Sequence, residues 1–322
     1  MVRGMRSRTR LATALVSVVV VALVAAAPAS AYLRNFHVAQ GASPSNSTPI
    51  KGLVLPVGLC GGLSTGYIGG LAFVSPSLTK LAVTEMQPFG GFLYGGSATD
   101  TQSGNWRVFT RGMCAENTAT PPTTGSAAAY VKGLTYRSAT SSSNSVPVKS
   151  ATARCPTGKT AIGGGARITT VSSNIALLGV QRVRGVTAIR AAAHEVDATG
   201  VSWKVRAIAV CANITSGTPT TDYINNVFQT VNPPTPASSN PSQTIFRGCP
   251  AGYVVVGGGG RILGGASFNN TNRDVALVRS EPFFNGSVWG WLAEGRETDP
   301  TSGTWRVNAS VTCGTPNGGP PV

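Results

Sequence analysis

The chain has 322 residues and a formal net charge of +15, from 26 Lys and Arg against 11 Asp and Glu, with only two His. So few His exclude a metal site built from several His ligands, and no motif predicts a cofactor. The basic residues lie singly or in pairs among Ser, Thr and Gly, which argues against the clustered basic face of a nucleic-acid-binding protein.

Residues 1–31 predict a secretory signal peptide, because four Arg precede an apolar run and Ala29-Ser30-Ala31 offers small residues for cleavage. A membrane anchor is the alternative, but Pro28 ends the apolar run before the about 20 residues that a spanning helix needs. We expect cleavage after Ala31, export from the cell and no membrane span in the mature chain. Without those four Arg the chain keeps 22 basic and 11 acidic residues. This balance predicts either a weak, salt-sensitive attraction to anionic polymers or solubility alone.

Three copies of one motif occupy the rest of the chain. Residues 155–168 read CPTGKTAIGGGARI, residues 249–262 read CPAGYVVVGGGGRI, and a weaker copy begins at Cys60. Each copy closes with a Trp that is followed eight residues later by a Cys, and such fixed spacing indicates tandem repeats. We place the three repeats at residues 32–118, 126–215 and 222–316, with a disordered tail at 317–322.

The six Cys permit fifteen pairings, of which the repeat pattern selects pairing within each copy. Each such disulfide closes a long loop and is worth about 4 kcal/mol on the chain-entropy model. Buried free thiols are the alternative, which fits poorly with an oxidising compartment. The expected pairs are Cys60 with Cys114, Cys155 with Cys211, and Cys249 with Cys313.

Within each repeat the sequence predicts strands and no helix, because β-branched runs are bounded by Gly, Asn, Pro and Ser. In the second repeat we expect strands at 130–136, 160–169, 175–181, 187–193 and 201–210. In the third repeat we expect them at 223–231, 253–263, 275–281, 288–294 and 304–312. The predicted fold is therefore all-β, with about five strands in each repeat.

The Gly runs at 163–165 and 257–260 invite comparison with a phosphate-binding loop. That interpretation fails because Ala153 stands where such a loop needs its first Gly, and because a strand rather than a helix follows. We interpret the runs as places where a strand bends or another backbone approaches closely, as at a crowded symmetry axis.

No constellation of catalytic residues is recognisable. His194 and Glu195 are neighbours on an expected strand and so point to opposite faces, and we interpret His194 as a surface histidine. Glu294 and Glu297 lie close together, as carboxylates for sugar hydrolysis would, but the first repeat has no acidic counterparts. An enzyme would need Glu294, Glu297 and His194 brought together across repeats, so we expect a non-enzyme.

The link between the third and fourth strands differs most between repeats and is the candidate recognition surface. Aromatic side chains can stack on sugar rings, and Arg can bind acidic groups in a bidentate manner. Packing in the core is the alternative role for these residues. The ligand-binding candidates are Phe89, Phe92, Tyr94, Arg182, Arg184, Arg190, Phe283, Phe284, Trp289 and Trp291.

The pattern CPxGxxxxGGGxR followed by WxVxxxxxC resembles repeats in uncharacterised secreted proteins of actinobacteria. Some of those proteins carry a single copy behind a collagen-like stretch, which implies that three copies in one chain are a trimer written in tandem. The three Cys-bounded repeats are also faintly similar to vitelline membrane outer layer proteins, which implies a β-prism. The first repeat departs most from the pattern, with Gly61 in place of Pro and Ala72 in place of Arg. Neither resemblance implies a catalytic residue.

We therefore expect one pseudo-threefold all-β unit, with three separate beads as the alternative. The predicted function is that of a secreted, monomeric, non-enzymatic binding or surface-associated protein that recognises glycans or anionic cell-wall polymers. A purely structural secreted protein is the first alternative, and a glycan-active enzyme is the second. We expect no cofactor, no metal and no nucleic acid as ligands.

Overall fold

A computed structural model describes the chain at residues 32–33, 37–48, 50–55, 65–75, 81–89, 93–100, 105–116, 128–129, 131–169, 174–213, 225–231, 233–251, 253–264 and 274–315. These residues form strands and connecting turns, with no helix among them that could cross a membrane. The all-β prediction is confirmed. The expected signal peptide at 1–31 and the tail at 317–322 lie outside the described residues.

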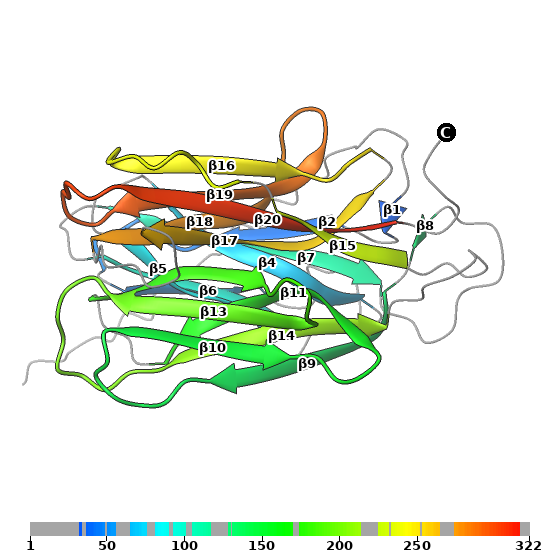
Figure 1. Cartoon of the computed structure of the whole chain (residues 1–322), viewed down its shortest axis with the longest axis horizontal. Helices are drawn as coiled ribbons and strands as arrows, with labels where there is room; N and C mark the ends of the chain where they lie inside the picture. The colour runs from blue at the N-terminus through cyan, green and yellow to red at the C-terminus, as the bar shows by residue number, and fades with distance from the viewer. Residues whose placement is uncertain are drawn as a thin grey trace, which may run out of the picture.

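Each predicted repeat contains six long strands, most of which run roughly along the longest axis of the molecule (Figure 1). The first repeat contains β2 (His37–Ala42), β3 (Ile50–Leu55), β4 (Thr65–Ser75), β5 (Leu81–Phe89), β6 (Leu93–Asp100) and β7 (Arg107–Glu116). The second contains β9 (Lys132–Thr140), β10 (Val148–Arg154), β11 (Lys159–Ile168), β12 (Ile175–Arg182), β13 (Ala188–Glu195) and β14 (Val205–Asn213). The third contains β15 (Asn225–Val231), β16 (Ser242–Gly248), β17 (Val254–Gly264), β18 (Val275–Phe284), β19 (Trp289–Glu297) and β20 (Trp305–Thr315). The short strands β1 (Tyr32–Leu33) and β8 (Ala128–Ala129) pair in parallel.

The expectation of about five strands per repeat missed β3, β10 and β16. These are edge strands of their sheets, so only one face of each needs apolar side chains. In β10 the buried positions are Lys149, Ala151 and Ala153, which alternate with polar residues. Two small residues and a Lys give too weak an apolar signal to identify a strand from sequence.

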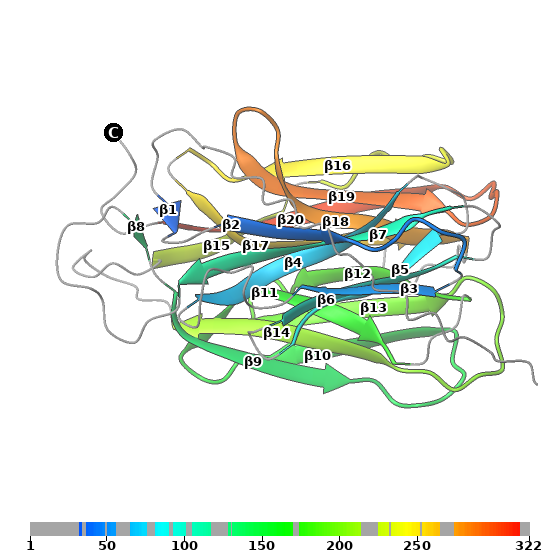
Figure 2. The ribbon, with the colours of Figure 1, turned by 180° about the vertical axis from the view of Figure 1, so that it is seen from behind.

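The three large sheets each combine strands from two repeats. Their orders are β10-β13-β12-β17-β20-β15, β3-β6-β5-β11-β14-β9 and β16-β19-β18-β4-β7-β2. Each repeat therefore gives three strands to one sheet and three to another, and the three repeats interlock in a closed ring. Figure 2 shows the first repeat's β2, β4 and β7 lying between third-repeat strands above and second-repeat strands below. Three independent beads are incompatible with this strand order.

The two halves of each sheet meet through very few residue pairs. Arg167 pairs with Glu85 and its neighbour Ala166 with Met86, whereas Gly179 pairs with Arg261 and Arg279 pairs with Phe73. A β-bulge lies directly before or at this meeting point in β5, β12 and β18. The bulge bends the strand, so that each sheet turns a corner where one repeat meets the next.

Beyond the bulge, β5 and β12 cross closely over β11 and β17, which are the Gly-rich strands of the next repeat. A methyl group at Gly259 would overlap the carbonyl oxygen of Val180, and one at Gly165 would overlap that of Met86. A methyl group at Gly257 would overlap the carbonyl oxygen of Ile162. The Gly runs therefore permit close backbone approach between repeats, and they bind no phosphate through a helix, because each lies within a strand.

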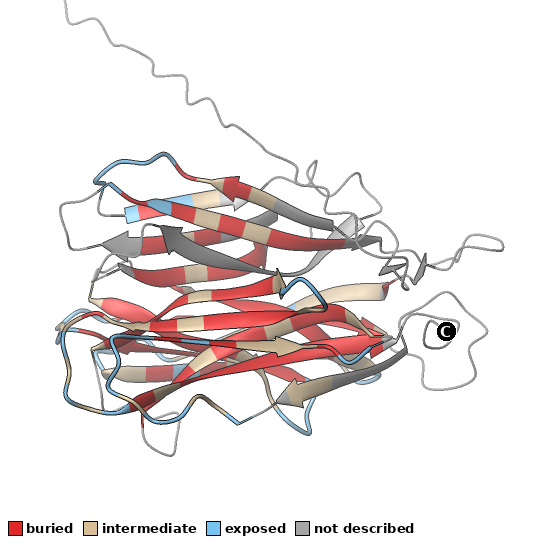
Figure 3. Cartoon of the chain, turned by 90° about the horizontal axis from the view of Figure 1, so that it is seen from above, coloured by how far each residue is buried: buried red, intermediate tan, exposed pale blue. Residues whose placement is uncertain are grey.

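The core is centred on three fully buried Trp, namely Trp106, Trp203 and Trp305. Buried residues follow the strands (Figure 3). A buried Lys149 lies with its Nζ 4.4 Å from the ring centroid of Trp203 and donates to the Trp203 and Asn144 carbonyl oxygens. Lys51 makes the same contacts with Trp106 in the first repeat. In each case the ammonium group fastens the loop that precedes its strand to the core.

Two of the three expected disulfides, Cys155–Cys211 and Cys249–Cys313, are present. Cys114 is buried and disulfide-bonded, and Cys60 lies outside the described residues. Disulfides of this kind are typical of proteins from oxidising compartments.

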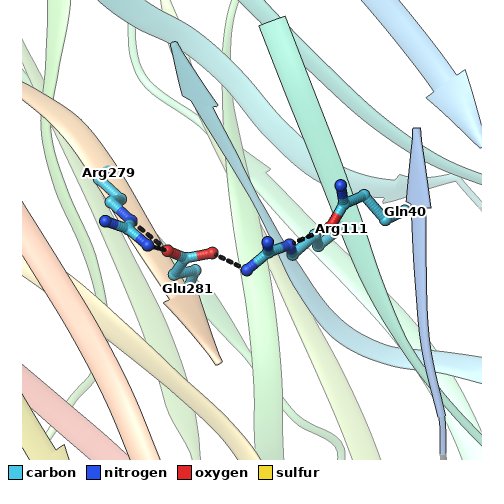
Figure 4. A network of polar contacts seen from close by, with 4 residues as sticks. All are labelled: Gln40, Arg111, Arg279 and Glu281. Carbon is cyan, nitrogen blue, oxygen red and sulfur yellow. Dashed lines mark hydrogen bonds and ion pairs between the residues drawn. The ribbon is translucent and has the colours of Figure 1, made fainter. Parts of the chain in front are cut away.

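A buried ion-pair network lies where the third repeat meets the first (Figure 4). Glu281 on β18 is fully buried and accepts hydrogen bonds from Arg279 on the same strand and from Arg111 on β7. Arg111 also donates to Gln40 on β2, at 2.6 Å. Burial raises the pKa of Glu281, and the two guanidinium groups oppose this effect. The network joins strands from the two ends of the chain.

Candidate functional site

The first of the three candidate hairpins, which connects β5 and β6, is only partly described by the structure. Phe89 ends β5 and Tyr94 lies in β6. Phe92 and the side chains of Phe89 and Tyr94 lie outside the described residues. The site is therefore built from the hairpins of the second and third repeats.

In the second repeat, residues 183–187 connect β12 to β13 in a tight turn. Gly185 has a φ of 76°, a conformation that other residues adopt only at a cost. The Val183 amide donates to the Ala188 carbonyl oxygen at 2.9 Å and closes the turn. The Cys155 amide donates to Thr187 at 2.8 Å, which holds the hairpin against the disulfide-bonded end of β10. These bonds place Arg182 at the base of the hairpin and the exposed Arg184 at its tip.

A pocket of about 580 Å³ lies beside this hairpin. It is lined by Arg154, Cys155, Arg182, Gly185, Val186 and Thr187. Arg182 was a predicted candidate, whereas sequence analysis missed Arg154 because it did not identify β10 as a strand. The alternation along β10 turns Arg154 to the exposed side and could have identified it.

The described residues that line this pocket include two Arg and no carboxylate. Among the residues that the structure describes, no acidic group forms an ion pair with Arg154, Arg182 or Arg184. The Nη1 atom of Arg182 is buried and has no hydrogen-bond partner within the described part of the chain. Burial lowers the pKa of Arg182, because desolvation disfavours the charged guanidinium. An unpaired, partly desolvated guanidinium is costly unless a ligand supplies an acceptor.

Two further Arg continue the positive charge along β12. Arg190 pairs in register with Gln181, and its Nη2 donates to Ser150 at 3.1 Å. Arg261 pairs with Gly179, and its pKa is lowered by burial and then by the charge of Arg190. The register positions run from Gly179 to Arg182, which is three steps or about 10 Å along β12. Because side chains alternate along a strand, Arg154, Arg190 and Arg261 share one face of the sheet, and Arg182 projects to the other. We call this set the basic strip, and it consists of Arg154, Arg182, Arg184, Arg190 and Arg261.

The third-repeat hairpin carries aromatic side chains in place of Arg. Phe284 ends β18 and Trp289 begins β19, with ring centroids 5.4 Å apart and planes tilted by 44°. Between them, the Asn285 Oδ1 accepts hydrogen bonds from the amides of Ser287 and Val288, and Gly286 has a φ of 94°. Figure 1 shows this hairpin (orange) projecting beyond β16. The turn therefore presents Phe284 and Trp289 on a rigid support.

Trp291 lies deeper than Phe284 and Trp289, which are both half-buried. Only 2 % of Trp291 is exposed, its ring covers Gly258, and its Nε1 donates to Ser280 at 2.9 Å. Trp289 and Trp291 face the same side of β19, but Trp291 lies one step further into the core, so it takes the packing role. Phe283 is half-buried against Phe246, with centroids 6.0 Å apart, beneath the guanidinium of Arg279.

The residues considered for an enzyme are not brought together. His194 is fully buried on β13, which corrects the interpretation of a surface histidine, because its strand has core contacts on both faces. Glu294 and Glu297 lie on β19, in a different sheet from β13. Glu294 accepts a hydrogen bond from Arg296 at 2.7 Å. No group of three or more His, Cys, Asp or Glu among the described residues is arranged to hold a metal ion.

No protein family matches the chain, and none of the curated proteins is significantly similar to it. The function is therefore argued from the side chains of the two hairpins.

Proposed function

We propose that the protein is a secreted, non-enzymatic binding protein for anionic polymers and that the basic strip is its binding site. The observation that carries this proposal is Arg182, which lines the same pocket as Arg154 and whose buried Nη1 has no partner among the described residues. A carboxylate, sulfate or phosphate group can accept two parallel hydrogen bonds from one guanidinium, and such charge-assisted bonds are about twice as strong as neutral ones.

The length of the basic strip supports a polymer rather than a single ion. Arg154, Arg190 and Arg261 share one face of the sheet, where their guanidinium groups can bind successive anionic groups of an extended chain. Arg190 and Arg261 repel each other, and a polyanion would relieve that repulsion. A salt-sensitive interaction is therefore expected, because the exposed part of the strip is screened by ions.

The proposal places the protein outside the cell. The arginine-rich start, the apolar run and the Ala29-Ser30-Ala31 site support a cleaved signal peptide. The disulfides support folding in an oxidising compartment. Acidic polysaccharides of the cell wall or its surroundings are then the polymers within reach.

Polymer binding by the mature protein tests the proposal. Polygalacturonate serves as the anionic probe and dextran as the neutral one, at low and physiological salt. Replacing Arg154 and Arg182 by Gln should weaken polygalacturonate binding about 10-fold or more, since each charge-assisted bond is worth about 1.5–3 kcal/mol. The matched control replaces the exposed Arg137 and Arg206 on β9 and β14, which removes the same charge elsewhere.

Equal losses in the two double variants would mean that net charge alone attracts the polymer, and the site would be rejected. Absence of polygalacturonate binding at low salt would reject the function. The purely structural alternative would then take its place.

A further inference from the structure

The second and third repeats build the same hairpin with different side chains. Counted from the β-bulges that follow Leu177 and Leu277, Arg184 occupies the position of Phe284. By the same register Trp289 replaces Thr187, and Gly248 replaces Arg154. One backbone therefore presents guanidinium groups in the second repeat and aromatic rings in the third.

Two paired Gly lie beside Trp289, on the opposite face of β16 and β19. Gly248 and Gly290 pair across β16 and β19, and a methyl group at Gly248 would meet Val288, while one at Gly290 would meet the Phe246 ring and the Arg247 carbonyl oxygen. The ring of Phe246 lies over Gly290, and the Cys249 amide donates to the Trp289 carbonyl oxygen at 3.0 Å. This bond fixes the backbone at Trp289, and the half-buried Trp289 ring packs against the core cluster that contains Trp291. Little conformational freedom is therefore lost when a ligand packs on the ring.

A cation lies close to these rings. Arg247 pairs in register with Trp291 and precedes Gly248. Its Nη1 and Nη2 donate to the Phe246 and Pro233 carbonyl oxygens, but its Nε is buried without a partner among the described residues. Burial lowers the pKa of Arg247. The third-repeat hairpin thus combines flat apolar surface with a guanidinium that no described carboxylate neutralises.

We infer that Phe284, Trp289 and Arg247 form a sugar-ring subsite for an acidic glycan. This inference rests on the proposed function and names its ligand class. A sugar ring has an apolar C–H face that packs on aromatic carbon, while its carboxylate requires a cation nearby. A polyanion without rings would use the basic strip alone. A single-stranded nucleic acid also combines anionic groups with stacking rings, and it is the main competing ligand in the test.

The test compares three polyanions of matched charge, namely oligogalacturonate, polyphosphate and oligothymidylate. The variants are Trp289→Ala, Phe284→Ala and the conservative control Trp289→Phe, with calorimetric affinities and near-ultraviolet circular dichroism to verify folding. Trp289→Ala should weaken oligogalacturonate binding about 10-fold and leave polyphosphate binding within about twofold. Trp289→Phe should retain most of the affinity, because the aromatic surface remains.

The outcomes separate the subsite from the proposed function. If Trp289→Ala and Phe284→Ala both leave oligogalacturonate binding unchanged, or if Trp289→Ala weakens polyphosphate binding equally, the subsite is rejected while polyanion binding by the basic strip stands. If oligothymidylate loses as much affinity as oligogalacturonate, the specificity for sugar rings is rejected. If none of the three polyanions binds, both the subsite and the proposed function are rejected.

Discussion

Arg111 and Glu281 lie 170 residues apart in the chain and form an ion pair of 2.6 Å at the contact between the first and third repeats. Counted from the β-bulges in β5, β12 and β18, the positions equivalent to Glu281 at the other two contacts between repeats are Gln87 and Gln181. The contact that closes the ring is therefore distinguished by a buried charge. Buried ionic groups of this kind can specify which surfaces meet.

Glu281→Ala should destabilise the protein by about 3 kcal/mol, because it leaves Arg111 and Arg279 facing a buried site without a counterion. Glu281→Gln should cost less, about 1–2 kcal/mol, since an amide still accepts hydrogen bonds and is tolerated at the two equivalent positions. Equilibrium urea unfolding measures both. A Gln variant that is less stable than the Ala variant would contradict this assignment.

Lys149→Met should destabilise the protein by about 2–3 kcal/mol, because the carbonyl oxygens of Asn144 and Trp203 lose a charged donor. Lys149→Gln should cost only about 1 kcal/mol. The third repeat supports this difference, since Gln243 makes the corresponding 2.8 Å bond to the Trp305 carbonyl oxygen. Thermal unfolding of the two variants checks the order, and equal losses would mean that only the Lys stem matters.

Gly259→Ala should destabilise the protein by about 3 kcal/mol or more, because its methyl group would overlap the carbonyl oxygen of Val180. The control is Gly200→Ala, whose methyl group would meet nothing within 4 Å. That variant should be neutral or slightly stabilising. Unfolding midpoints measure the contrast, and similar values for both variants would refute close approach between repeats as the function of the Gly run.

Tyr136→Phe should protect the protein against alkali. Burial raises the pKa of Tyr136 above its ordinary value of 10.0, so in the folded chain the phenol stays protonated while in the unfolded chain it ionises. Above pH 10 the unfolded state therefore binds fewer protons, and stability falls by about 1.4 kcal/mol per pH unit from this group. Below pH 9 Tyr136 should contribute no pH dependence. The difference in unfolding free energy between wild type and Tyr136→Phe, measured from pH 8 to 11, should show this slope, and a flat difference would contradict it.

Local sequence patterns were sufficient to predict the all-β class, the two described disulfides and the close packing of the Gly runs. β-branched segments between turn residues depend on neighbours in the chain, so they predict strands without knowledge of the fold. The Trp–Cys spacing likewise predicts the Cys155–Cys211 and Cys249–Cys313 pairs. The edge strand β10, with Ala and Lys at its buried positions, lacks such a signal, and Arg154 was missed with it.

The sequence by itself determined that this chain would be a disulfide-bonded, all-β protein, because strand propensity and Cys spacing are written in each segment. Only the tertiary structure decided that each repeat divides its strands between two sheets, since similar repeats present similar edges and sequence cannot tell which edges pair. The same contacts buried His194 and Trp291 and brought Arg261 of the third repeat beside Arg190 of the second. The basic strip therefore exists only in the folded ring, because its members lie on strands that meet across repeats.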